Sequence, residues 1–212
     1  VQDFGGSNFN DVLTGDGGDN WLDGAGGDDL LDGGTGDDTM SGSGGNDTLL
    51  GGAGNNTLDG GAGTDTVDYS AAPGAVNVNL AGLAATQNGF GGHDNMVNVE
   101  AVVGTGFADT LQGSLSGGST LIGGAGDDAY LVMGPCVSVV ENPGGGNDAE
   151  ISGIASLALA DNVEQLQLSE GHGAVTGIGN GLDNLIAGNS LGNLYPLTGV
   201  TLPFISYGGS SL

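Results

Sequence analysis

Side chains that bind hard cations recur at a fixed spacing in the first third of this sequence. An Asp or Asn occupies every ninth position over seven consecutive units: Asp11, Asn20, Asp29, Asp38, Asp47, Asn56 and Asp65. Their oxygens, together with carbonyls of Gly-rich turns, form an all-oxygen environment that suits Ca²⁺ better than the tighter, wetter Mg²⁺. The sequence has no His or Cys cluster to recruit zinc or copper. We therefore predict a row of calcium sites between the turns of this segment.

The elements that must position these ligands follow from the rest of each unit. Six nine-residue units run without a gap from Gly15 to Asp68, and a degenerate unit, Gly6–Thr14, precedes them. Position one is always Gly, position six is the Asp or Asn, and position eight is always aliphatic. The first six residues favour a turn, and the last three form a short strand with one inward side chain. Two units then make one coil of a parallel β-solenoid.

Stacking of alternate units predicts the core. Successive coils lie about 4.8 Å apart, which brings the carboxylates of neighbouring turns into rows. The core is only a double row of aliphatic side chains, too thin to resist repulsion among the 14 acidic residues of the first 68. Two facing ladders are expected, one of Leu13, Leu31, Leu49 and Val67 and the other of Leu22, Met40 and Leu58.

The charge balance also requires cations. The chain has 212 residues, no Lys or Arg and 26 acidic residues, so its formal net charge is −26. This charge excludes an electrostatic nucleic-acid binder and a polybasic membrane-surface module, because nothing can neutralise phosphate. High charge and 48 Gly are also typical of disorder, but a hydrophobic fraction of 37% and the strict period oppose that interpretation. A compact fold must therefore obtain its countercharge from outside the chain, and bound cations are the simplest source.

The units resemble the repeats-in-toxin (RTX) nonapeptide, G-G-x-G-x-D-x-U-x, of the hemolysin-type calcium-binding family. The resemblance implies an all-β parallel β-roll in which position-six side chains and turn carbonyls hold Ca²⁺ between coils. It makes the seven position-six residues the implied ligands, among which Asn20 and Asn56 depart from Asp and are neutral and weaker. Two later segments match the same unit: Gly106–Gly113 resembles the degenerate first unit, and Gly123–Leu131 is a good unit with Tyr130 in the aliphatic slot. Asp109 and Asp128 therefore join the expected metal ligands.

Beyond Tyr69 we expect irregular coils of the same solenoid, up to a last degenerate unit at Gly179–Asn189. The predicted segments are a tandem β-roll at 5–68, an interrupted solenoid at 69–134, further coils at 135–194 and an atypical apolar tail at 195–212. Cys136, alone in the chain, is expected to be a small buried residue. Strands are predicted at Val76–Leu80, Val97–Val103, Val137–Glu141, around Ile151 and at Val163–Leu168.

The tail, Tyr195–Leu212, carries no acidic residue and two prolines. It resembles a short motif of the SEDS family of membrane-embedded cell-wall polymerases, but none of that family's membrane helices is present, so no activity follows. The tail is interpreted either as foreign to the solenoid or as an apolar segment that caps the last coil or docks on a neighbour.

No catalytic constellation is found, and we expect no enzyme activity. Three functions are considered: a calcium-dependent secreted structural or adhesive module, the RTX appendage of a larger secreted protease, lipase or polysaccharide epimerase, and an ice- or polysaccharide-binding segment. The first is favoured. The acidic, disulfide-free chain resembles cargo of type I secretion, which implies an extracellular or cell-surface location. Calcium ions are the expected partners, without nucleic acid or membrane insertion. Head-to-tail self-association or a surface polysaccharide is a further expectation.

Overall fold

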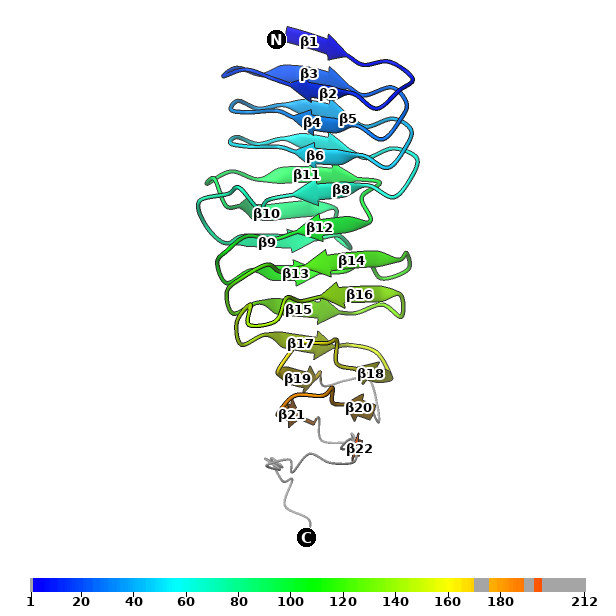
Figure 1. The fold of residues 1–212 in the computed structure, drawn as a ribbon, viewed down its shortest axis with the longest axis vertical. Coiled ribbons are helices and arrows are strands. Elements are labelled where there is room, and N and C mark those ends of the chain that lie inside the picture. Colours follow the sequence, from blue (N-terminus) through cyan, green and yellow to red (C-terminus); the bar gives the residue numbers. More distant parts are fainter. Residues whose placement is uncertain (1, 170–175, 189–192, 196–212) are drawn as a thin grey trace.

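The computed structural model describes residues 2–169, 176–188 and 193–195. Every regular element in these ranges is a β-strand, and the strands stack along the long axis of the molecule (Figure 1). No helix long and apolar enough to cross a membrane occurs among the described residues. The predicted all-β solenoid is therefore confirmed. Residues 196–212, most of the predicted tail, lie outside the described ranges.

The strands form three sheets. The first sheet is, in spatial order, β1 (Gln2–Gly5), β3 (Asn20–Asp23), β5 (Thr39–Ser41), β7 (Thr57–Asp59), β11 (Asp94–Val97), β10 (Ala84–Asn88), β9 (Val76–Asn79), β13 (Thr110–Gln112), β15 (Ala129–Val132), β17 (Ala149–Ser152), β19 (Gln165–Leu168) and β21 (Leu185–Ala187). The second sheet is β16 (Val137–Val140), β14 (Ser119–Ile122), β12 (Ala101–Val103), β8 (Thr66–Asp68), β6 (Thr48–Leu50), β4 (Leu30–Asp32) and β2 (Val12–Thr14). The third sheet is β18 (Ser156–Ala158), β20 (Thr176–Ile178) and β22 (Asn193–Tyr195).

The tandem units alternate between the first two sheets, as predicted. Leu31 is in register with Leu13 on one side and with Leu49 on the other, and Val67 follows Leu49. In the facing sheet, Met40 is in register with both Leu22 and Leu58. From Leu22 to Val67 these side chains are at most 1% exposed. The central side chain of each short strand therefore faces the core, and the 18-residue coil is confirmed.

The regular stacking is interrupted after β8. The chain passes to β9, turns back through the antiparallel β10 and returns in β11, which stacks parallel on β7. In the second sheet β12 lies directly beside β8. The predicted strand Val97–Val103 is therefore wrong: β11 ends at Val97, Asn98 adopts a positive φ of 52°, and β12 begins at Ala101 in the other sheet. A residue with left-handed φ cannot continue a strand.

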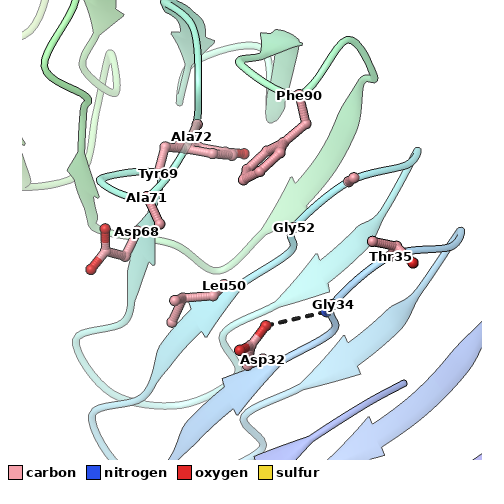
Figure 2. Close-up of a pocket in the computed structure, with 11 residues that line it drawn as sticks. Asp32, Gly34, Thr35, Leu50, Gly52, Asp68, Tyr69, Ala71, Ala72 and Phe90 are labelled. Atoms are coloured by element: carbon pink, nitrogen blue, oxygen red, sulfur yellow. Dashed lines mark hydrogen bonds between the residues drawn. The ribbon is translucent and has the colours of Figure 1, made fainter. Parts of the chain in front are cut away.

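The insertion places β11, β10 and β9 between β7 and β13 in the first sheet, whereas β12 alone lies between β8 and β14 in the second. Beside it lies a pocket of about 240 Å³, whose lining includes Leu50, Tyr69, Ala71, Ala72 and Phe90 (Figure 2). Its two carboxylates serve the local turns: Asp32 accepts the N–H of Gly34 at 3.2 Å, and Asp68 accepts the N–H of Ser70 at 2.7 Å. The lining is otherwise mainly apolar, so the pocket is no candidate metal site.

Later coils are longer and carry polar side chains in inward positions. Tyr130 of β15 pairs in register with Leu111 of β13 and with Glu150 of β17, and Glu150 pairs with Leu166. Tyr130 and Glu150 are at most 1% exposed, so the aliphatic slot accommodates larger groups in these coils. The expectation that Cys136 is buried is wrong, because it lies exposed in the turn that precedes β16.

Candidate metal sites

The position-six side chains form hydrogen-bonded ladders along both sides of the solenoid. On one side, Oδ1 of Asp29 accepts the backbone N–H of Asp11, Oδ1 of Asp47 accepts that of Asp29, and Oδ1 of Asp65 accepts that of Asp47, each at 2.8 Å. Each carboxylate thus binds the turn of the preceding coil, and one of its oxygens is used by this bond.

The second ladder contains the two Asn positions. Asn20 donates its backbone N–H to Asp38, Asp38 to Asn56, and Asn56 to Asp94. The amide of Asn56 also donates to Oδ1 of Asp94 at 2.9 Å, and the amide of Asn20 donates to Asp16 at 3.2 Å. Both Asn side chains are therefore engaged as hydrogen-bond donors as well as acceptors.

The ladder continues where the sequence period is lost. Oδ1 of Asp109 accepts the backbone N–H of Val76. In the following coils, Oδ1 of Asp128 accepts the N–H of Asp109, and Oδ1 of Asp148 accepts the N–H of Asp128. Sequence reasoning missed Asp94 and Asp148. The signal is a Gly two residues before the Asp, as in Gly92-His93-Asp94 and Gly146-Asn147-Asp148, with an inward residue two positions later. Glu100 and Glu164, which accept the N–H groups of Asp65 and Asp148, follow no such pattern.

The turns fall into two conformational classes. In the turns that we call capped, the backbone N–H of position two donates to the position-six side chain of the same unit. Ser7 donates to Oδ2 of Asp11 at 2.6 Å, and Thr105 donates to Oδ2 of Asp109 at 2.5 Å. Asp16 donates in the same way to Asn20, and Asn180 to Asn184. Position four of a capped turn has no positive φ in the described residues, which explains why Phe9 and Phe107 are tolerated there.

In the turns that we call open, position two is left-handed and makes no such bond. Its φ lies between 69° and 106° at Ala25, Gly34, Ser43, Gly52, Gly61, Gly124 and Gly144. The turn of Gly52 has Asn56 at position six. In the other six turns position six is Asp, and each Asp leaves one buried oxygen with no hydrogen-bond partner among the described residues: Oδ2 of Asp29, Asp38, Asp47, Asp65, Asp128 and Asp148. A buried carboxylate oxygen without a partner costs free energy, so it needs a proton or a cation.

Backbone carbonyl oxygens lie close to the unpartnered Oδ2 atoms of the open turns. A Cβ on Gly33 would lie 2.5 Å from Oδ2 of Asp38 and 2.9 Å from the carbonyl oxygen of Gly51 in the next coil. Position one must therefore be Gly, because carboxylate and carbonyl oxygens crowd its Cα. This arrangement of oxygens from adjacent coils fits Ca²⁺, which binds carboxylates and carbonyls together.

Burial shifts the protonation of these carboxyls. Desolvation raises the pKa of Asp38, Asp47 and Asp65, while a hydrogen bond from a backbone N–H partly opposes the rise. The same cause raises the pKa of Asp128 to about 7 and of Asp148 to about 6. Neighbouring carboxylates raise all five further, since the chain has no Lys or Arg to compensate them. A bound cation would hold them ionised.

A further ladder of hydrogen-bond acceptors, separate from the two position-six ladders, lies at position five and was not predicted. Oδ1 of Asp19 accepts the N–H of Asp37 at 2.9 Å, and Oδ1 of Asp37 accepts that of Asn55 at 2.8 Å. The bond has the opposite sense to the position-six ladder, because here the later coil donates to the earlier one. These side chains are exposed, so water also reaches them.

The fold and these sites define a β-solenoid whose turns gather carboxylate and carbonyl oxygens for hard cations. Comparison with family models agrees: residues 5–40 and residues 41–71 each match the family model described as RTX calcium-binding nonapeptide repeat (4 copies). The tandem units are therefore RTX repeats, which bind Ca²⁺, and the predicted resemblance is confirmed over these residues. A search of curated proteins gave no match.

Proposed function

We propose that this chain is a calcium-dependent structural module that acts outside the cell and folds as its turns bind calcium. The observation that carries the proposal is the set of buried carboxylate oxygens without partners in the open turns. With a formal charge of −26 and no Lys or Arg, folding without cations would bury these groups uncompensated. Metal binding and folding then share one free energy.

We assign the strongest calcium ligands to the open turns, at Asp29, Asp38, Asp47, Asp65, Asp128 and Asp148. In the capped turns, Asp11, Asn20 and Asp109 already receive an N–H from their own unit, which competes with a metal. The side-chain N–H of Asn56 donates to Asp94. The Nδ2 atom of Asn56 therefore takes the place where a ligand oxygen would be needed. Among the predicted ligands, we expect these four to contribute least.

Export and partners remain part of the proposal. RTX repeat proteins are typically secreted or extracellular, and a chain that folds only at extracellular calcium concentrations can pass a type I channel unfolded. We favour a structural or adhesive role, with segments at 5–68, 69–134, 135–194 and 195–212. An appendage of a larger secreted enzyme is the alternative. Self-association through the tail stays a prediction, since residues 196–212 lie outside the described ranges.

A matched pair of variants tests the ligand assignment. Asp37 and Asp38 are neighbours in one turn, but Asp38 is 1% exposed with an unpartnered Oδ2, whereas Asp37 is exposed and accepts an N–H. Calcium titration of the full chain by calorimetry should show weaker binding in Asp38→Asn and nearly unchanged binding in Asp37→Asn. Equal losses in both variants would mean that net charge, and not the site, governs binding.

A further inference from the structure

Three buried carboxylates meet beyond the segment that matches the RTX repeats. Asp128 and Asp148 come from open turns of neighbouring coils, and Glu141 follows β16, outside any repeat-like unit. Each offers an oxygen within 4.8 Å of an oxygen of the other two. Their exposed fractions are 2%, 7% and 0% for Asp128, Glu141 and Asp148.

The hydrogen bonds of the cluster leave two oxygens unsatisfied. Glu141 accepts the hydroxyl of Tyr130 at Oε2 and the N–H of Asn142 at Oε1, the latter at 2.7 Å. Asp128 and Asp148 each accept one N–H at Oδ1, at 2.8 and 2.9 Å. Oδ2 of both Asp residues is buried and has no partner among the described residues. Two unpartnered oxygens therefore lie in a cluster with a third carboxylate.

Among the described residues, no Lys, Arg or His side chain compensates this charge. The sequence has no Lys or Arg and two His, of which His93 contacts the carbonyl of Thr86 in the inserted hairpin and His172 lies outside the described residues. Burying three carboxylates side by side is costly unless they coordinate a cation. The all-oxygen donor set favours a hard divalent ion.

We propose that Asp128, Glu141 and Asp148 form one composite calcium site, in which the third carboxylate comes from outside the repeats. The tandem turns have no corresponding three-carboxylate group among the described residues. Because calcium affinity rises with the number of charged ligands, this site binds more tightly than sites in the tandem turns. The ion joins the loop that begins at Glu141 to the turn of the preceding coil.

Tyr130 is the positioning residue of this site. Its ring fills the inward slot of β15, and its hydroxyl donates to Glu141. A hydrogen bond to a charged group restrains that group and stabilises it. Tyr130 therefore holds Glu141 toward the two Asp side chains, which explains a phenol where the tandem units have an aliphatic residue.

The test compares Glu141→Gln with Glu150→Gln in the full chain. Glu150 is a buried carboxyl of β17, two residues after Asp148. It accepts the N–H of Ala160 and lies outside the three-carboxylate group. Equilibrium dialysis counts bound Ca²⁺ per chain, and calorimetry gives the affinities. Glu141→Gln should lose one ion, or bind it at least tenfold more weakly, while Glu150→Gln keeps the full count. The tightest site should be the one affected.

Other outcomes decide against the site or separate it from the proposed function. Unchanged binding in Glu141→Gln, or an equal loss in Glu150→Gln, would overturn the composite site. If Glu141→Gln does not fold, Tyr130→Phe decides: one site weakened about tenfold supports the proposal, and unchanged affinities refute it. If Asp38→Asn leaves binding unchanged but Glu141→Gln reduces it, the assignment of the tandem turns fails and the composite site stands.

Discussion

The tandem block, residues 5–68, and the interrupted half, residues 69–187, support the same ladder with different spacing. In the tandem block, successive position-six residues on one side are 18 residues apart, as from Asp29 to Asp47. In the interrupted half the separation is 19 residues from Asp109 to Asp128 and 20 from Asp128 to Asp148. The N–H to Oδ1 bond is kept in both, so the ladder constrains the fold more than the length of the coil does.

The two regions differ in charge density and in what fills the core. The tandem block has 14 acidic residues among the first 68, whereas residues 69–187 contain 12. The inward slots from Leu22 to Val67 are all aliphatic, but the interrupted half includes Tyr130 and Glu150. The tandem block therefore depends more on cations, and the interrupted half more on packing and side-chain hydrogen bonds.

The largest effect is expected from chelation. Removal of calcium should unfold the tandem block, because its core is thin and its carboxylates repel one another. Each site filled at 100 times its dissociation constant contributes about 2.7 kcal/mol, and several sites act together. Hydrogen exchange of peptides from both regions, with and without chelator, measures this. Greater loss of protection within residues 97–168 than within residues 20–68 would contradict the conclusion that the tandem block depends more on cations.

Glu150→Gln should give the next largest effect, confined to high pH. Burial raises the pKa of Glu150 from an ordinary 4.5 to about 7. The folded state therefore binds the proton more strongly than the unfolded state, so stability falls as the pH rises from about 4.5 to 7. The full penalty, about 3 kcal/mol, applies above pH 7. The variant should unfold later than the parent in denaturant at pH 8, in the presence of calcium, and at the same point at pH 4. A pH-independent difference would contradict this.

A pair of glycine variants compares position one of a tandem unit, Gly33, with position three of a turn in the interrupted half, Gly106. Gly33→Ala forces a Cβ against Oδ2 of Asp38 and the carbonyl of Gly51, whereas a Cβ on Gly106 meets nothing within 4 Å. We expect Gly33→Ala to destabilise the chain by about 1–3 kcal/mol and Gly106→Ala to be nearly neutral. Thermal unfolding at saturating calcium measures the difference. Equal losses would show that crowding of the Cβ by oxygens does not set the cost at position one.

The smallest effect tests whether the exposed position-five ladder is equivalent in the two regions. Asp37 accepts the N–H of Asn55 at 2.8 Å, and Asp127 accepts the N–H of Asn147 at 2.9 Å. Replacement of either by Ala should cost about 1 kcal/mol, since each removes one exposed hydrogen bond to the backbone. Denaturant unfolding at fixed calcium compares the two variants. A much larger loss at Asp37 would indicate that it also binds a metal.

The sequence by itself determined the coil, the inward ladders and the oxygen chemistry. A strict period of nine needs no tertiary information: Gly at position one fixes the turn, and Leu49 or Met40 at position eight can only face inward in a three-residue strand. The absence of Lys and Arg likewise required cations whatever the fold.

Only the tertiary structure decided which turns are open, where β10 reverses the chain, and that Glu141 joins Asp128 and Asp148. These features depend on backbone conformation and on contacts between residues with no common spacing. The position-six Asp11 and Asp29 look alike in the sequence, yet one accepts the N–H of Ser7 and the other keeps an unpartnered oxygen. The difference arises from φ at position two, which a Ser or an Ala does not specify and the stacked coils do.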